Sequence, residues 1–129
     1  MEWLKKGFFR IIEGPFNARQ EKLLGERATY TKQDFVASFD CDVRISLAVW
    51  NRLIKDCSIN GFKPHPADEL CRVYGLVDED LDDLVLELLE NCNRGRPRQN
   101  DLLGREPIKN VKDLVYFISD CSNFWTCTD

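Results

Sequence analysis

Apolar side chains recur every three or four residues along most of this chain, and this spacing is typical of amphipathic helices. The alternation of apolar and polar residues that predicts strands is not seen. One predicted helix covers about residues 42 to 56. A second covers about residues 78 to 92, with Asp78 as its predicted cap. A third follows Pro107, with Asn110 as its predicted cap and Asp113 at its third helical position. The pattern therefore predicts an all-α fold.

The apolar positions also predict which side of each helix is buried. In the first helix they are Val43, Leu47, Trp50, Leu53, Ile54 and Cys57. In the second they are Leu81, Leu84, Val85, Leu88 and Leu89, and in the third Val111, Leu114, Val115, Ile118 and Cys121. We expect the centre of the core to be formed by Leu47, Trp50, Ile54, Leu84, Leu88, Val115 and Ile118.

The first 40 residues are predicted to form a helical extension, separate from a bundle at residues 41–129. An apolar stripe with a basic flank lies within residues 1–13 and ends at Gly14-Pro15. We expect this stripe to pack on the domain or on a second subunit, rather than on a membrane surface. A short helix from Ala18 to Leu24, ended by Gly25, and a helix capped by Thr31 complete the extension.

The segment between the first two long helices contains Asn60-Gly61 and Pro64-His65-Pro66, which predict a loop. Pro66 is suited to the first position of a short helix that ends near Gly75, because its missing N–H is not needed there.

Composition limits the class of protein further. A chain of 129 residues that is 43% hydrophobic can bury a single core without disulfides or metal. Its net charge of −4 argues against a general nucleic-acid-coating role. The six cysteines form no Cys-x-x-Cys pair and His65 is the only histidine, so we expect reduced thiols, no metal site and a cytoplasmic protein. No cofactor and no catalytic residues are predicted, because His65 lies between two prolines in a predicted loop, where we expect a surface residue.

The stretch from Asp68 to Cys92, together with Pro-Ile-Lys-Asn-Val-Lys-Asp-Leu-Val from residue 107, resembles the second half of an acyl carrier protein. Asp80-Leu81-Asp82 is similar to the Asp-Ser-Leu-Asp turn of that family, with the serine lost. The resemblance covers about residues 42 to 119. It implies an acyl carrier protein-like four-helix bundle, here with an added N-terminal helical extension, and it is closest to divergent bacterial members that lack the serine.

In that family the serine receives the phosphopantetheine arm, and the corresponding positions here are Asp78, Glu79 and Asp80. No serine occurs between Ser58 and Ser119. The resemblance therefore implies the fold of a carrier without its prosthetic group. A divergent carrier that is modified elsewhere, for instance at Ser58, stays an alternative.

Two charged clusters are candidate partner-binding sites. The first is acidic and comprises Asp78, Glu79, Asp80, Asp82 and Asp83. A calcium loop is excluded, because the sixth and twelfth positions counted from Asp78 are Asp83 and Leu89 instead of Gly and Glu. Carboxylates at the start of a helix complement its dipole, and in carriers such a helix also contacts basic patches on partner enzymes.

The second cluster is basic and comprises Arg94, Arg96 and Arg98. Its Arg-Gly-Arg-Pro core is similar to an AT-hook, which inserts into the minor groove of A·T-rich DNA. A single copy between two predicted helices favours a solvated loop, or recognition of a partner's carboxylates or phosphates. We therefore expect a non-catalytic protein-interaction module; a nucleic-acid-binding regulator is the alternative. The partner and the oligomeric state stay open.

Overall fold

The computed structural model describes residues 17–55, 57, 59–93 and 107–121. Within these residues the protein is helical and contains no strand, apart from one isolated bridge between Glu69 and Asn110. The all-α prediction is therefore confirmed. A helical segment covers residues 17–26, and the remaining helices are α2 (Lys32–Ala37), α3 (Val43–Lys55), α4 (Leu70–Tyr74), α5 (Asp78–Asn91) and α7 (Val111–Asp120).

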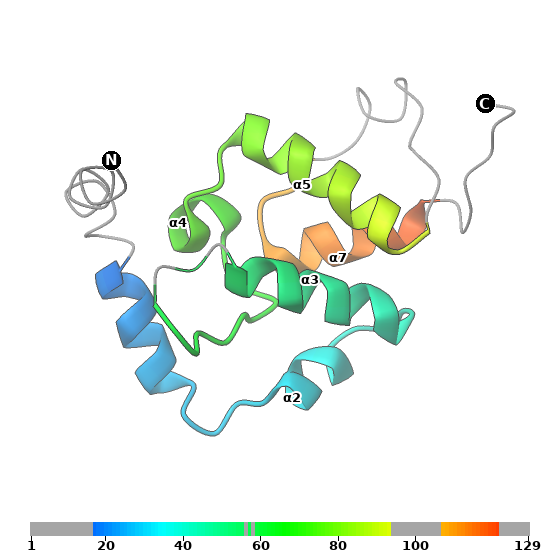
Figure 1. The fold of residues 1–129 in the computed structure, drawn as a ribbon. Coiled ribbons are helices and arrows are strands. Elements are labelled where there is room, and N and C mark those ends of the chain that lie inside the picture. The colour runs from blue at the N-terminus through cyan, green and yellow to red at the C-terminus, as the bar shows by residue number, and fades with distance from the viewer. Residues whose placement is uncertain (1–16, 56, 58, 94–106, 122–129) are drawn as a thin grey trace, which may run out of the picture.

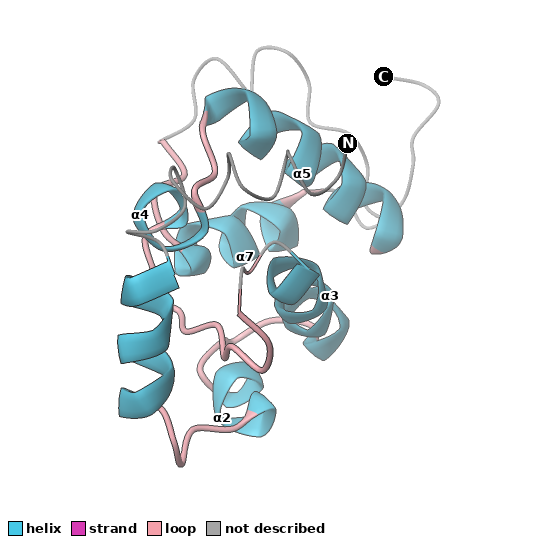
Figure 2. Ribbon diagram, turned by 60° about the vertical axis from the view of Figure 1, so that its left-hand side comes forward, coloured by secondary structure: helices cyan, strands magenta, loops and turns pink. Residues whose placement is uncertain are grey.

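Three helices form the centre of the fold. α3, α5 and α7 contact one another in pairs, and α2 packs against α3 (Figure 1). The helical segment 17–26 lies at the edge of the molecule beside α4 in both ribbon views (Figures 1 and 2). There the side chain of Gln20, buried in the contact, donates a hydrogen bond of 2.7 Å to the carbonyl oxygen of Val73.

The helix starts follow from local polar chemistry. Thr31 caps α2 and Asn110 caps α7, and in each case an aspartate three residues later accepts a hydrogen bond from the cap's backbone N–H. Both caps were predicted correctly. α5 differs, because its cap is Val77, and the carboxylate of Asp80 accepts from the Val77 N–H at 3.3 Å. The prediction that Asp78 caps this helix is wrong by one residue.

The core contains most of the predicted side chains. Trp50, Leu84, Leu88, Val115 and Ile118 are all buried. Ile54 is 39% exposed and Leu47 is only half-buried, so these two predictions are wrong.

The difference between the predicted and the observed buried face of α3 has a physical cause. Its sequence carries two overlapping apolar stripes, and the structure buries the one that contains Ile45, Val49 and Leu53. α2 places the ring of Phe35 edge-on against Trp50, with centroids 5.2 Å apart, so Trp50 lies at one side of the buried face. The stripe with Val43 and Ile54 therefore lies at the rim of the contact.

Two predicted helix boundaries are also wrong: the start of α4 and the end of the first helical segment. Pro66 lies in a turn and α4 begins only at Leu70. Glu69 is extended, and residues 68 and 70 on either side of it exchange hydrogen bonds with residues 109–111, including Leu70 N–H to the Lys109 carbonyl at 2.9 Å. Gly75 ends α4 in the left-handed conformation (φ 72°), as its position predicted. Gly25 does not end the first helical segment, which continues to residue 26.

The proposed division into residues 1–40 and 41–129 stays a prediction. Phe35 and Phe39 nevertheless belong to the same hydrophobic core as α3, α5 and α7. The predicted apolar stripe within residues 1–13 lies outside the described residues. Among the helices that the structure describes, none has the length and apolar character needed to cross a bilayer.

Candidate functional site

The acidic cluster lies on the outward face of α5. All five of its carboxylates, from Asp78 to Asp83, are exposed, whereas Leu81, Leu84 and Leu88 point into the core. The first turn holds Asp78, Glu79 and Asp80, where negative charge complements the helix dipole. The structure therefore brings this predicted set together on one surface.

An exposed leucine lies within this acidic surface. Leu86 is 42% exposed, and residues three, four and seven positions away on a helix share its face. Among these neighbours Glu79, Asp82, Asp83 and Glu90 are exposed, whereas Leu89 on the other side is buried. We call Leu86 and these four carboxylates the acidic face.

Three of the four carboxylates of the acidic face are not neutralised by ion pairs with described residues. Arg52 of α3 pairs with Glu87, at the side of α5. Glu79, Asp83 and Glu90 form no ion pair with any residue that the structure describes. A basic partner surface would therefore meet several carboxylates around one apolar side chain.

The basic cluster gives no such geometry. Arg94, Arg96 and Arg98 lie outside the described residues, so their prediction as a partner-binding site stays untested.

A second polar centre surrounds Asp68, which sequence reasoning did not identify. Its side chain is 3% exposed and accepts four hydrogen bonds. Oδ2 accepts from Arg27 Nη1 at 3.0 Å, from the Tyr74 hydroxyl at 2.7 Å and from the His65 backbone N–H at 3.0 Å. Oδ1 accepts from Arg27 Nη2. A buried carboxylate needs such donors, because burying an unpaired charge is costly.

Arg27 joins the first helical segment to this loop. Its Nη1 also donates to the carbonyl oxygen of Lys63 at 2.7 Å, and its guanidinium lies 5.3 Å from the centre of the Phe62 ring. Lys63 in turn donates through Nζ to the carbonyl oxygens of Arg27 and Ala28. The end of the first helical segment is thus held to the loop before α4 by a bidentate ion pair and several hydrogen bonds to backbone carbonyl oxygens.

Burial and charge shift the pKa values of two neighbouring groups. Burial, and then the adjacent Asp68 carboxylate, raise the pKa of Tyr74 well above its ordinary value, so the hydroxyl keeps its proton and acts as a donor. Burial, and then the positive charge of Arg27, lower the pKa of His65. The Nδ1 of His65 accepts the Ala67 N–H at 3.1 Å, which fits a neutral imidazole. The prediction that His65 is only a surface residue is therefore incomplete.

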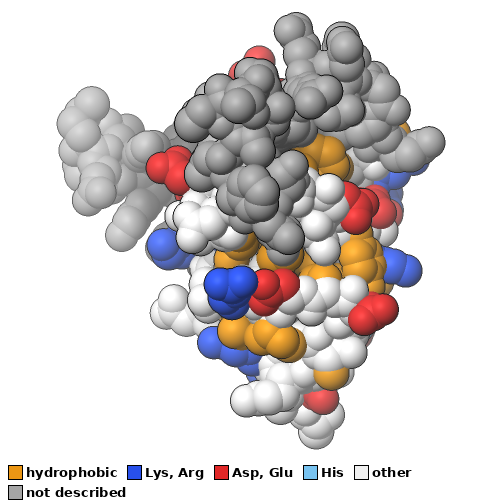
Figure 3. All heavy atoms as spheres, turned by 90° about the vertical axis from the view of Figure 1, so that its right-hand side faces the viewer, with side chains coloured by type: hydrophobic (Ala, Val, Ile, Leu, Met, Phe, Trp, Pro, Cys, Tyr) orange, Lys and Arg blue, Asp and Glu red, His pale blue; other side chains and the backbone are white. Residues whose placement is uncertain are grey.

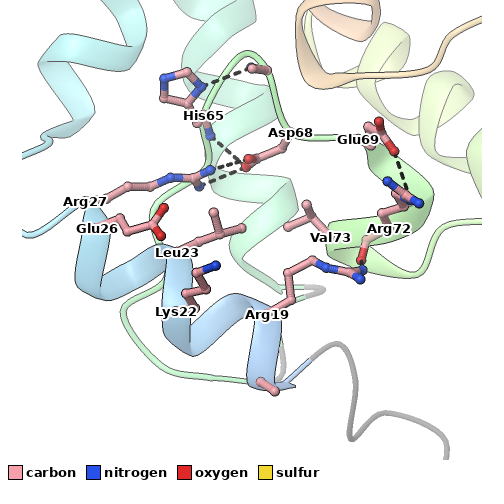
Figure 4. Close-up of a pocket in the computed structure, with 12 residues that line it drawn as sticks. Arg19, Lys22, Leu23, Glu26, Arg27, His65, Asp68, Glu69, Arg72 and Val73 are labelled. Carbon is pink, nitrogen blue, oxygen red and sulfur yellow. Dashed lines mark hydrogen bonds and ion pairs between the residues drawn. The ribbon is translucent and has the colours of Figure 1, made fainter.

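An open cleft of about 840 Å³ lies between the first helical segment and α4 (Figure 4). One wall is formed by Ala18, Arg19, Lys22, Leu23, Glu26 and Arg27, and the other by His65, Ala67, Asp68, Glu69, Arg72 and Val73. None of these lining residues is a serine, threonine or cysteine. This arrangement offers charged and apolar groups for binding and no hydroxyl or thiol nucleophile.

Three cysteines lie at the opposite end of the fold, where α3 begins and α5 and α7 end. Cys41 precedes α3, and Cys92 and Cys121 are the caps that end α5 and α7. That face carries a band of hydrophobic side chains beside acidic and basic groups (Figure 3). Among the described residues, no three potential metal ligands gather, and no disulfide joins two of the described cysteines.

Comparison of the sequence with protein-family models gives no matching family, and comparisons with curated proteins and with solved structures give no match. Within the described residues the protein has an all-α fold with an exposed acidic helix.

Proposed function

We propose that this chain is a non-catalytic protein-interaction module with a carrier-like helical fold, and that it docks a basic partner surface on the acidic face of α5. The observation that carries the proposal is the placement of Leu86 among four exposed carboxylates. Charge complementarity accelerates encounter with a partner, and a central apolar anchor supplies affinity when it is buried.

The order of elements supports the carrier-like part of the proposal. A long helix (α3), a long connection containing the short α4, an acidic helix (α5) and a shorter helix (α7) follow one another as the resemblance implies. The contacts among α3, α5 and α7 are consistent with a bundle of this kind.

The start of α5 supports a role without the phosphopantetheine arm. Its first turn presents Asp78, Glu79 and Asp80. A carboxylate at this position provides no hydroxyl to form the phosphodiester, so the helix retains only the docking role of a carrier.

Site-specific photo-crosslinking tests the docking face. A benzophenone amino acid is placed at position 86 and, as a matched control, at Val43, which is 51% exposed at the start of α3. We expect an adduct with a discrete protein partner from position 86 only.

A charge variant gives the second arm of this test. Glu79→Gln, Asp82→Asn and Asp83→Asn together should abolish the adduct. Glu21→Gln, Asp40→Asn and Asp120→Asn remove the same number of charges from exposed positions elsewhere and should leave it intact. Equal adducts in both triple variants, or an adduct from position 43 alone, would show that α5 is not the docking face.

A further inference from the structure

The cleft between the first helical segment and α4 carries an inference independent of α5. Contacts at both ends of the cleft join its two walls. At one end Arg19 donates to the Arg72 carbonyl oxygen at 2.6 Å, and at the other Arg27 pairs with Asp68. Figure 4 shows these two arginines, one within the first helical segment and one directly after it, reaching to the opposite wall. The cleft is therefore preformed.

Some charged side chains that line the cleft form ion pairs with each other, and others do not. Asp68 is satisfied by Arg27, and Glu69 pairs with Arg72 at 3.4 Å. Arg19 uses one guanidinium nitrogen for the carbonyl of Arg72. Lys22 lines the same cleft and has no ion pair or side-chain hydrogen bond with a described residue. Lys22 is also one helical turn from Arg19, so both lie on one side of the segment.

The carboxylates that line the cleft do not cancel the positive charge of Arg19 and Lys22. Glu26 is the one lining carboxylate that forms no ion pair with a described residue, and it lies one turn beyond Lys22, toward Arg27. Arg19 and Arg72 thus lie at the other end of the cleft with Glu69 beside them, and Lys22 lies between Arg19 and Glu26.

Apolar side chains line the middle of the cleft. Leu23 and Val73 face each other across it, with Ala18 and Ala67 in the same lining (Figure 4). A volume of about 840 Å³ lies within the range of small-molecule sites. From these features we propose that the cleft binds a small organic anion, with its carboxylate or phosphate on Arg19 and Lys22 and its apolar body between Leu23 and Val73.

Amide proton–nitrogen correlation spectra of the full chain test the proposal, with phenyl phosphate as the probe. Inorganic phosphate and benzyl alcohol separate the anionic from the apolar contribution. We expect saturable shifts at the amides of residues 18–23 and 72–73, with phenyl phosphate binding about tenfold more tightly than inorganic phosphate. Benzyl alcohol should give no saturable shift. Equal binding of the two phosphates, or shifts that map elsewhere, overturns the proposal.

Variants assign the effect to the two cations. Lys22→Gln, which removes no contact of the fold, should weaken phenyl phosphate binding about fivefold or more, and adding Arg19→Gln should abolish it. Lys32→Gln with Lys112→Gln removes two exposed charges elsewhere and should change nothing. Unchanged binding in Lys22→Gln contradicts the assignment. Much tighter binding of an oligoglutamate peptide in the same cleft would replace the small anion by an acidic protein partner.

Discussion

Arg27→Met should destabilise the protein strongly, because it leaves Asp68 charged and buried with only two of its four hydrogen bonds. The remaining donors are the Tyr74 hydroxyl and the His65 backbone N–H. Methionine keeps much of the apolar stem of arginine, so the loss reports mainly the guanidinium. The two side chains are 11% and 3% exposed, so solvent screens the pair little.

Breaking a buried ion pair by removing one partner typically costs about 3–5 kcal/mol. The two donors that remain offset part of this, so we expect the free energy of unfolding to fall by about 3 kcal/mol. Urea unfolding followed by far-ultraviolet circular dichroism measures the change. In a double-mutant cycle with Asp68→Asn, the coupling free energy should exceed about 1.5 kcal/mol.

Arg44→Met is the matched control, because Arg44 pairs with Asp42 on the surface with 83% of its side chain exposed. It should leave the unfolding curve unchanged. A loss below about 1 kcal/mol for Arg27→Met, the range of surface pairs, would refute the reasoning. It would mean that water reaches Asp68 when the guanidinium is absent.

Three further predictions concern the core, the single histidine and the missing serine. Leu88→Ala, at a fully buried position of α5, should cost about 2–5 kcal/mol, while Ile54→Ala, at a position 39% exposed, should cost clearly less; equal losses in urea unfolding would contradict the observed face of α3. Because the folded-state pKa of His65 is lowered, the unfolded chain binds a proton more readily, so stability should be full above pH 6.5 and decline as the pH falls through that value. His65→Asn, whose amide oxygen can still accept the Ala67 N–H, should remove this decline, and an unchanged pH profile would contradict it. Incubation with coenzyme A and a phosphopantetheinyl transferase should leave the intact mass unchanged, whereas a gain equal to the phosphopantetheine arm at any residue would restore a carrier role.

Local chemistry explains which parts of the fold could be predicted. The caps at Thr31 and Asn110 and the apolar stripe of α5 depend on residues three or four positions apart, so the sequence displays them directly. α3 is different, because its apolar residues cover more than one stripe and only the positions of α2, α5 and α7 decide which one is buried. Periodicity alone could not distinguish Ile45 from Ile54.

Contacts between distant segments account for what could not be predicted. The helix start at Pro66 was wrong because residues 68–70 pair with residues 109–111 instead. The pair of Arg27 with Asp68 joins residues 41 positions apart, and no spacing rule relates them. The first turns of α5 needed only helical geometry, so Glu79, Asp82 and Asp83 of the acidic face were predicted from sequence, but Glu90 and the exposure of Leu86 at its centre were not.

The most direct test of the account is the dissociation constant of the partner identified by crosslinking at position 86. The account predicts that Leu86→Ala, and separately the triple variant of Glu79, Asp82 and Asp83, raises this constant about tenfold or more, with the wild-type affinity falling as salt is added. Val43→Ala and the triple variant of Glu21, Asp40 and Asp120 should leave it within about twofold. A dissociation constant that is unchanged by Leu86→Ala and by the α5 triple variant, or that is insensitive to salt, would contradict the claim that α5 is the docking face.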